Sequence, residues 1–144
     1  MDIKRIDHIG VAVDDLAQAK GFFVDFGFTV LGEAEEQSEL LDKVVGMKGA
    51  KSQIVFLQAP NNQITLELTK FLHPADVPVS SETHMYSRGI KHLAFVVENI
   101  EDVVATVKQK GWDVFVDVYN YENTYKLCYF HGPEGIILEL VEEL

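Results

Sequence analysis

One stretch decides the fold of this chain, Ile6-Asp7-His8-Ile9-Gly10-Val11-Ala12-Val13, because it returns later as Ile90-Lys91-His92-Leu93-Ala94-Phe95-Val96-Val97. The offset between the copies is constant: the histidines are 92 − 8 = 84 residues apart, and Gly27 and Gly111 are 111 − 27 = 84 apart. Each half also closes on a related phrase that contains a glutamate, Glu67 in the first half and Glu139 in the second. The chain is therefore an internal repeat with a histidine and a glutamate at matching places.

Each copy of the repeat predicts one βαβββ unit. Alternating apolar residues and turn signals predict strands at 3–13, 28–35, 52–59 and 63–69, then at 89–97, 113–118, 125–131 and 135–143. A helix follows the first strand of each unit, and Asp15 and Asn99 are its expected N-caps. Gly27 and Gly111 are expected to end these helices in the left-handed conformation. An extra segment at 38–48 predicts a short helix or lid in the first unit.

A single βαβββ unit exposes the inner face of its sheet, so two units have to share a core. We expect an α+β fold in which two tandem βαβββ modules form one curved eight-stranded mixed sheet, a half-open barrel with the helices outside. Residues 1–144 are expected to be a single domain, with modules at 1–70 and 89–144. The segment 71–88 is expected to be a linker, because prolines and serines interrupt its periodicity.

Composition excludes several classes of function. The formal net charge is −11 and no lysine or arginine cluster is present, which disfavours nucleic acids and anionic lipids as partners. No apolar run reaches membrane-spanning length, and the first residues lack the apolar core of a signal peptide. The only cysteine, Cys128, cannot form an internal disulfide, which favours the reducing cytoplasm. We therefore expect a cytoplasmic protein with a small-molecule substrate.

The two histidines and two glutamates lie opposite the most apolar face of their strands, as the period of two in a strand requires. A lone strand histidine is more often a hydrogen-bonded structural residue, and a lone strand glutamate more often faces solvent. Four such residues in matching positions instead favour a metal site. Imidazoles and carboxylates suit a divalent first-row metal ion such as Zn, Ni, Co, Mn or Fe. The candidate ligands are His8, Glu67, His92 and Glu139.

With these motifs, the chain resembles the vicinal oxygen chelate superfamily, which includes glyoxalase I, methylmalonyl-CoA epimerase, extradiol dioxygenases, and fosfomycin and bleomycin resistance proteins. The resemblance is closest to glyoxalase I and to methylmalonyl-CoA epimerase-like proteins. Bacterial glyoxalase I has its ligands in the order His-Glu-His-Glu, which is also the order here. The epimerase usually has a glutamine where Glu67 stands. Dioxygenases and fosfomycin resistance enzymes use three ligands, and bleomycin-binding members generally lack them.

The resemblance implies a divalent-metal-dependent lyase or isomerase that transfers a proton next to a carbonyl through a metal-stabilised enediolate. Glu67 or Glu139 is the implied base, and the sequence does not choose between them. Two alternatives stay open: an Fe(II) dioxygenase of the same superfamily, and a non-catalytic small-molecule-binding protein of the resistance type. The glutathione-binding segments of glyoxalase I have no strong match, so a thiol cofactor stays open as well. The resemblance also implies a homodimer.

Other side chains form a second group of candidates around the substrate. Three tyrosines cluster near the sixth and seventh predicted strands, Tyr119, Tyr121 and Tyr125. They either line a substrate pocket or pack the strands, and the sequence gives both interpretations equal weight. The remaining histidines have no symmetric partner and are expected at the surface, although His84 or Arg88 could border a substrate mouth.

Overall fold

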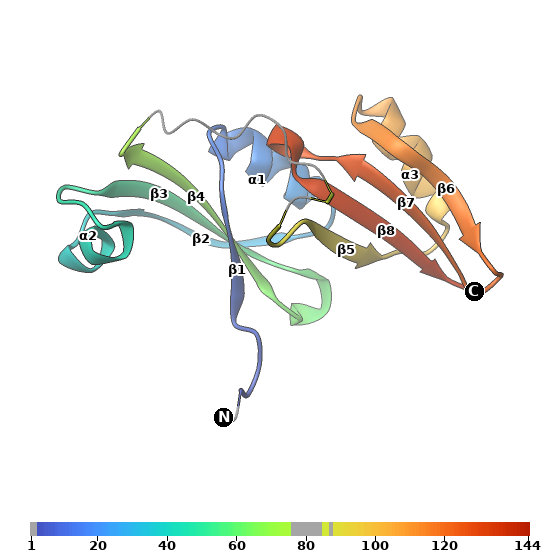
Figure 1. Cartoon of the computed structure of the whole chain (residues 1–144), viewed down its shortest axis with the longest axis horizontal. Helices are drawn as coiled ribbons and strands as arrows, with labels where there is room; N and C mark the ends of the chain where they lie inside the picture. The colour runs from blue at the N-terminus through green and yellow to red at the C-terminus, as the bar shows by residue number, and fades with distance from the viewer. Residues whose placement is uncertain (1–2, 76–84, 87) are drawn as a thin grey trace. The chain divides into compact units, whose positions relative to one another are not determined.

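The structure is a computed structural model that describes residues 3–75, 85–86 and 88–144. The chain divides into two compact units, Met1–Val79 and Ser80–Leu144 (Figure 1). Each unit contains one copy of the sequence repeat. In the described part of the chain, no helix is long and apolar enough to cross a membrane.

The first unit is a βαβββ module with one inserted helix. Its elements are β1 (His8–Ala12), α1 (Leu16–Asp25), β2 (Thr29–Glu36), α2 (Glu39–Val45), β3 (Lys51–Gln58), a 3-10 turn η1 (Pro60–Asn62) and β4 (Thr65–His73). The strands form a four-stranded sheet in the order β1-β4-β3-β2, in which β1 runs parallel to β4 and the other neighbours are antiparallel. Helix α2 is the insertion expected at 38–48.

The second unit repeats this topology without the inserted helix. Its elements are β5 (His92–Val96), α3 (Ile100–Gln109), β6 (Asp113–Tyr121), β7 (Tyr125–His131), a 3-10 turn η2 (Pro133–Gly135) and β8 (Ile137–Glu143). The sheet order is β5-β8-β7-β6, and β5 runs parallel to β8. The sequence repeat is therefore also a repeat of topology.

The predicted α+β class and both βαβββ modules are confirmed. The strands pair as two open four-stranded sheets, whereas we expected one continuous sheet of eight strands. The difference lies at β1 and β5, because in the described part of the chain each is the edge strand of its own sheet, with one hydrogen-bonded neighbour. The single-domain organisation stays a prediction. Of the expected linker at 71–88, β4 takes up residues to His73, while 76–84 and 87 lie outside the described residues.

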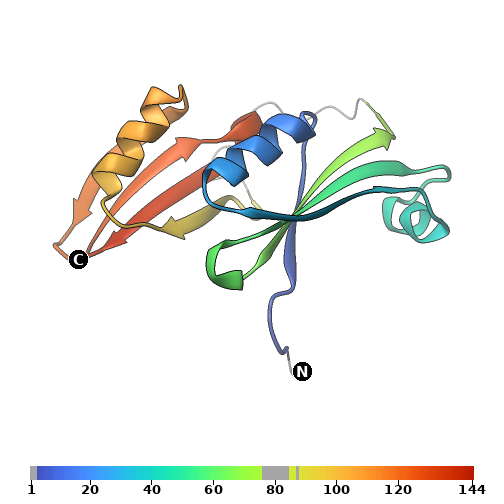
Figure 2. The same ribbon diagram turned by 180° about the vertical axis from the view of Figure 1, so that it is seen from behind.

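In each unit the repeated helix packs on one face of its own sheet, as Figure 2 shows from behind. Helix α1 contacts β3 and β4, and it places Phe23 with Leu57 and Leu68, all three fully buried. Helix α3 contacts β6, β7 and β8, with the completely buried Phe130 and Leu140 on the strands below. Burial of one such side chain stabilises the fold by roughly 1.5–3 kcal/mol. The helix-covered face of the sheet is thus the core of each unit. The candidate metal ligands are expected on the opposite face.

The beginning of α1 and the ends of both repeated helices follow the sequence prediction. The Asp15 carboxylate accepts a hydrogen bond from the Gln18 backbone N–H at 2.9 Å, which is N-cap geometry. Gly27 and Gly111 have φ angles of 92° and 85°, a left-handed conformation that a side chain would strain.

The beginning of α3 lacks the capping hydrogen bond that the sequence predicts. Asn99 precedes the helix, but its φ is 53° and its side chain makes no capping hydrogen bond. The carboxylate of Glu142, from β8, accepts the Ile100 backbone N–H at 2.9 Å instead. Asn99 is thus the N-cap residue, as predicted, but a residue 42 positions further along the chain supplies the side-chain acceptor.

Candidate metal centre

The first pair of predicted ligands, His8 on β1 and Glu67 on β4, lies on the sheet face that α1 does not cover. In the parallel register Gly10 lies directly opposite Glu67, so no side chain from that position stands beside the carboxylate. His8 Nε2 and Glu67 Oε2 are 3.8 Å apart. The side chains are 48% and 26% exposed, which leaves their donor atoms accessible from solvent.

The other ring nitrogen of His8 is held by its neighbour in sequence. His8 Nδ1 lies 3.0 Å from Asp7 Oδ2, and Arg5 pairs with the other oxygen of Asp7 at 2.7 Å. The hydrogen bond with Asp7 raises the pKa of His8, and the charge of Glu67 acts in the same direction. A carboxylate on Nδ1 fixes the orientation of the ring and leaves Nε2 as the nitrogen for a metal.

The second pair, His92 on β5 and Glu139 on β8, occupies the equivalent position in the second unit. Ala94 lies opposite Glu139 in the register, where the first unit has Gly10. His92 Nε2 and Glu139 Oε2 are 3.1 Å apart, and the Glu139 side chain is only 12% exposed. The same strand positions thus bring a histidine and a glutamate together in both units.

Tyr129 on β7 completes the surroundings of the second pair. It lies directly opposite Glu139 in the antiparallel register. Its ring meets the His92 ring edge to face, with centroids 5.7 Å apart. Burial, first, and the neighbouring Glu139 carboxylate raise the pKa of Tyr129 to about 12. The phenol is therefore protonated at neutral pH.

Our sequence analysis did not single out Tyr129. The signal that points to it is the turn at 132–135, because a tight hairpin fixes which residues face each other across β7 and β8. With His131 opposite Ile137, the register places Tyr129 opposite the predicted ligand Glu139.

The other sequence candidates do not join either pair. The rings of Tyr121 and Tyr125 stack on each other with centroids 5.2 Å apart, and Tyr119 is 59% exposed on β6. Their role beside a substrate stays a prediction. His131 is held by Asp113 at 2.8 Å, as a half-exposed surface residue. His84 lies outside the described residues.

The donors of both pairs fit a divalent metal ion. Two ligands at about 2.1 Å from a metal and at right angles to each other lie about 3 Å apart. The His92–Glu139 separation of 3.1 Å matches this, and the His8–Glu67 separation of 3.8 Å is somewhat wider. Among the described residues, no three His, Cys, Asp or Glu side chains form one cluster, so each unit offers a pair. The convergence of all four ligands on one ion stays a prediction.

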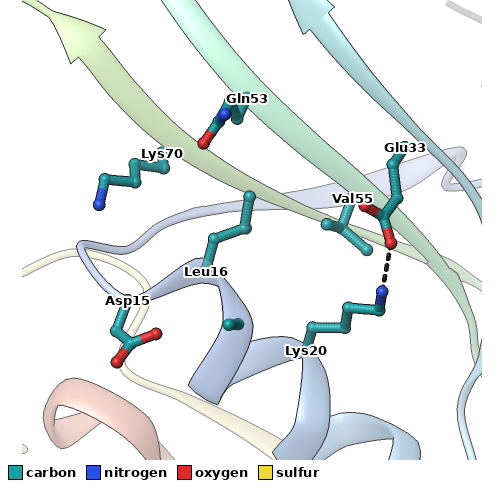
Figure 3. Close-up of a pocket in the computed structure, with 8 residues that line it drawn as sticks. Asp15, Leu16, Lys20, Glu33, Gln53, Val55 and Lys70 are labelled. Carbon is teal, nitrogen blue, oxygen red and sulfur yellow. Dashed lines mark hydrogen bonds and ion pairs between the residues drawn. The ribbon is translucent and has the colours of Figure 1, made fainter.

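A cavity of about 330 Å³ lies in the first unit, between the start of α1 and the sheet (Figure 3). Its charged lining residues are Asp15, Lys20, Glu33 and Lys70. Lys20 and Glu33 form an ion pair across it, drawn as the dashed line in Figure 3. Because Lys70 and Glu67 are an odd number of residues apart on β4, the cavity faces away from the His8–Glu67 pair. It is not part of the metal centre.

Comparisons with known proteins agree with this architecture. The family described as the Glyoxalase/Bleomycin resistance protein/Dioxygenase superfamily matches residues 7–129. The uncharacterized protein YaeR of Escherichia coli is 30% identical over 147 residues, covering 99% of each chain. A crystal structure of a glyoxalase family protein from Bacillus cereus is 30% identical, with a TM-score of 0.93 over 100% of this chain and 97% of that one. A lactoylglutathione lyase from Agrobacterium tumefaciens has the same fold, with a TM-score of 0.61 at 18% identity over 99% and 96% of the two chains.

Proposed function

Because the chain belongs to the glyoxalase/bleomycin resistance protein/dioxygenase superfamily, we propose that it is a divalent-metal-dependent lyase or isomerase of the glyoxalase I or methylmalonyl-CoA epimerase type. The main support is the repeated pair: in both modules a histidine Nε2 and a glutamate Oε2 face each other, at 3.8 and 3.1 Å.

The proposed ligands of one metal ion are His8, Glu67, His92 and Glu139. Nitrogen and carboxylate donors of this kind suit Zn, Ni, Co, Mn or Fe in the divalent state. When bound, such an ion supplies Lewis-acid polarisation of a substrate carbonyl. Asp7 holds His8 in the orientation that such binding needs, because it occupies the opposite ring nitrogen.

The chain itself provides the base. One of the two glutamates takes the proton from the carbon next to the carbonyl and later returns it, which regenerates the carboxylate. The partial burial of both carboxylates, 26% and 12% exposed, favours this role because it reduces competition from water. We further propose a homodimer, as the resemblance implies, and a cytoplasmic location, which the single buried cysteine supports.

Deuterium exchange tests the proposed reaction class directly. The purified protein would be incubated in D₂O with a panel of 2-hydroxyacyl thiol adducts and 2-methylmalonyl thioesters, with and without a chelator. We expect deuterium to enter at the carbon next to the carbonyl, the exchange to stop after metal removal, and addition of metal to restore it.

Three other outcomes would contradict the proposed reaction or favour one of the alternatives. Exchange that persists after complete metal removal, verified by elemental analysis, would refute a metal-dependent mechanism. No exchange on any compound, with metal bound, would favour the non-catalytic binding protein. Oxygen consumption by the iron-loaded protein in the presence of a catechol would favour the dioxygenase alternative.

A further inference from the structure

The start of the repeated helix has different surroundings in the two units, and the last strand of each unit accounts for the difference. In both units the register places the glutamate of this strand, Glu67 or Glu139, opposite a small residue of the first strand. The strands β4 and β8 therefore correspond residue by residue. Three residues further along, β8 carries Glu142 and β4 carries Lys70. A carboxylate in the second unit thus corresponds to an ammonium group in the first.

In the second unit, the carboxylate of Glu142 binds the start of α3. One of its oxygens accepts the Ile100 backbone N–H at 2.9 Å. The ammonium group of Lys126, directly opposite on β7, lies 3.8 Å from the same oxygen. The Glu142 side chain is only 20% exposed. The N–H groups at a helix start carry partial positive charge, so they and a lysine together stabilise a half-buried carboxylate at this place.

In the first unit, the corresponding place borders the cavity of about 330 Å³ shown in Figure 3. The first two residues of α1, Leu16 and Ala17, line this cavity together with Lys70. Gln53 lies opposite Lys70, where the second unit has Lys126. Both units therefore have a helix start and a lysine at this place, but only the second unit supplies the carboxylate from its own strand.

The other charged side chains around the cavity have partners. Lys20 and Glu33 form an ion pair at one end of it, drawn in Figure 3. Asp15 accepts the Gln18 backbone N–H at 2.9 Å. Among the residues that the structure describes, Lys70 forms no ion pair. A lysine beside a helix start favours a negatively charged ligand, because both attract the same charge.

We propose that this cavity binds the carboxylate of a small organic acid, in the position that Glu142 occupies in the second unit. The carboxylate accepts the N–H groups at the start of α1 and the ammonium group of Lys70. The apolar part of the acid lies against Leu16 and Val55, which Figure 3 shows between Lys70 and the Lys20–Glu33 ion pair. Pockets for small molecules have volumes of about 300–1,000 Å³, so a cavity of 330 Å³ suits an acid with a short chain.

Amide NMR titration of the full-length protein with butyrate tests the proposal. The amide signals of Leu16 and Ala17 should shift and reach saturation, because the bound carboxylate accepts hydrogen bonds from these N–H groups. The Ile100 amide should not respond, since Glu142 already occupies the equivalent place. Butyramide has nearly the same shape as butyrate but no charge, so we expect it to bind roughly ten-fold more weakly.

Variants of Lys70 test its part in the site. Lys70→Gln removes the charge and is expected to raise the Kd for butyrate roughly ten-fold. Lys70→Glu gives the first unit the carboxylate of the second, so it should abolish butyrate binding and shift the Leu16 amide signal without any ligand. Lys51→Gln is the matched control. Lys51 belongs to the same sheet but pairs with Glu35 at 3.5 Å and does not line the cavity, so the Kd should stay unchanged.

Several results would overturn the proposal. They are amide shifts that do not saturate, equal affinities for butyrate and butyramide, and an unchanged Kd in Lys70→Gln. Inorganic phosphate tests the class of ligand, because binding as tight as that of butyrate would indicate a site for anions in general. The comparison of ligands uses the wild-type protein, so it decides the question even if the Lys70 variants fail to fold. The proposed metal centre does not depend on the outcome, since it lies on the other face of the sheet.

Discussion

At the scale of single residues, the candidate ligands depend on neighbours that set their orientation. His8 is held by Asp7, the residue before it in the chain, whereas the neighbour of Glu139 is Tyr129, which lies opposite it on another strand. The first contact is local and is repeated wherever the strand forms. The second exists only once β7 and β8 have paired in the observed register. The candidate ligands of the two modules thus differ in where their neighbours come from.

The Asp7–His8 contact leads to a prediction on metal affinity. Asp7→Asn keeps the size of the side chain but removes the charge beside His8 Nδ1, so we expect the Kd for Co²⁺ to rise roughly ten-fold. Asp113→Asn is the matched control, because Asp113 holds Nδ1 of His131, which is not a proposed ligand. Absorption titration would give both values. Equal affinities in the two variants would contradict a role for Asp7.

Cys128 gives a second prediction, on thiol reactivity. Its side chain is fully buried, and burial raises the pKa of the thiol to about 11. Only the deprotonated thiol reacts with iodoacetamide, and a raised pKa lowers its fraction. At pH 8 we therefore expect Cys128 in the native protein to react at least about 100-fold more slowly than in the unfolded chain. The rate should rise with pH, about ten-fold per unit until the pKa is reached. Mass spectrometry measures the labelling, and a native rate equal to that in denaturant would refute the prediction.

At the scale of elements, the helix and the hairpin turn differ in how much room they leave for a side chain. Gly21 lies in the exposed face of α1, and a Cβ at this position would meet no atom within 4 Å. At Gly132, which begins the turn before β8, a Cβ would lie 2.8 Å from Cδ1 of the fully buried Leu138. The same substitution should therefore have opposite effects at the two positions.

The prediction is a pair of alanine variants. Gly21→Ala should stabilise the protein by about 0.5–1 kcal/mol, because alanine loses less backbone entropy in a helix than glycine does. Gly132→Ala should destabilise it by about 1–3 kcal/mol, because the buried leucine has to move. Urea denaturation followed by circular dichroism measures both changes, and changes of the same sign would contradict the packing described for the turn.

At the scale of the whole molecule, the chain consists of two modules that each bury one face of a sheet, and among the described residues each sheet ends in edge strands with one hydrogen-bonded neighbour. Such edges pair readily with another strand or another chain. A second copy of the chain is one way to cover them.

We therefore predict a homodimer. Light scattering should give twice the 16.2 kDa of one chain, with one metal ion per chain by elemental analysis. Removal of the metal by a chelator should lower the Tm by several degrees, because an ion that binds only the folded state stabilises it by mass action. A stable monomer at micromolar concentration would refute the dimer without affecting the fold, and an unchanged Tm would argue against a metal held by the folded protein.

The sequence by itself determined the features that depend on neighbouring residues. The offset of 84 residues predicted two βαβββ modules, and strand alternation predicted that His8 and Glu67 share a face, as do His92 and Glu139. These patterns are local, since a period of two is a property of one strand. The tertiary structure decided which side chains from distant strands lie beside the helix ends and the candidate ligands. Glu142 accepts the first backbone N–H of α3, and Tyr129 lies opposite Glu139, because register across a sheet is set by the packing of the whole ladder rather than by the residues of one strand.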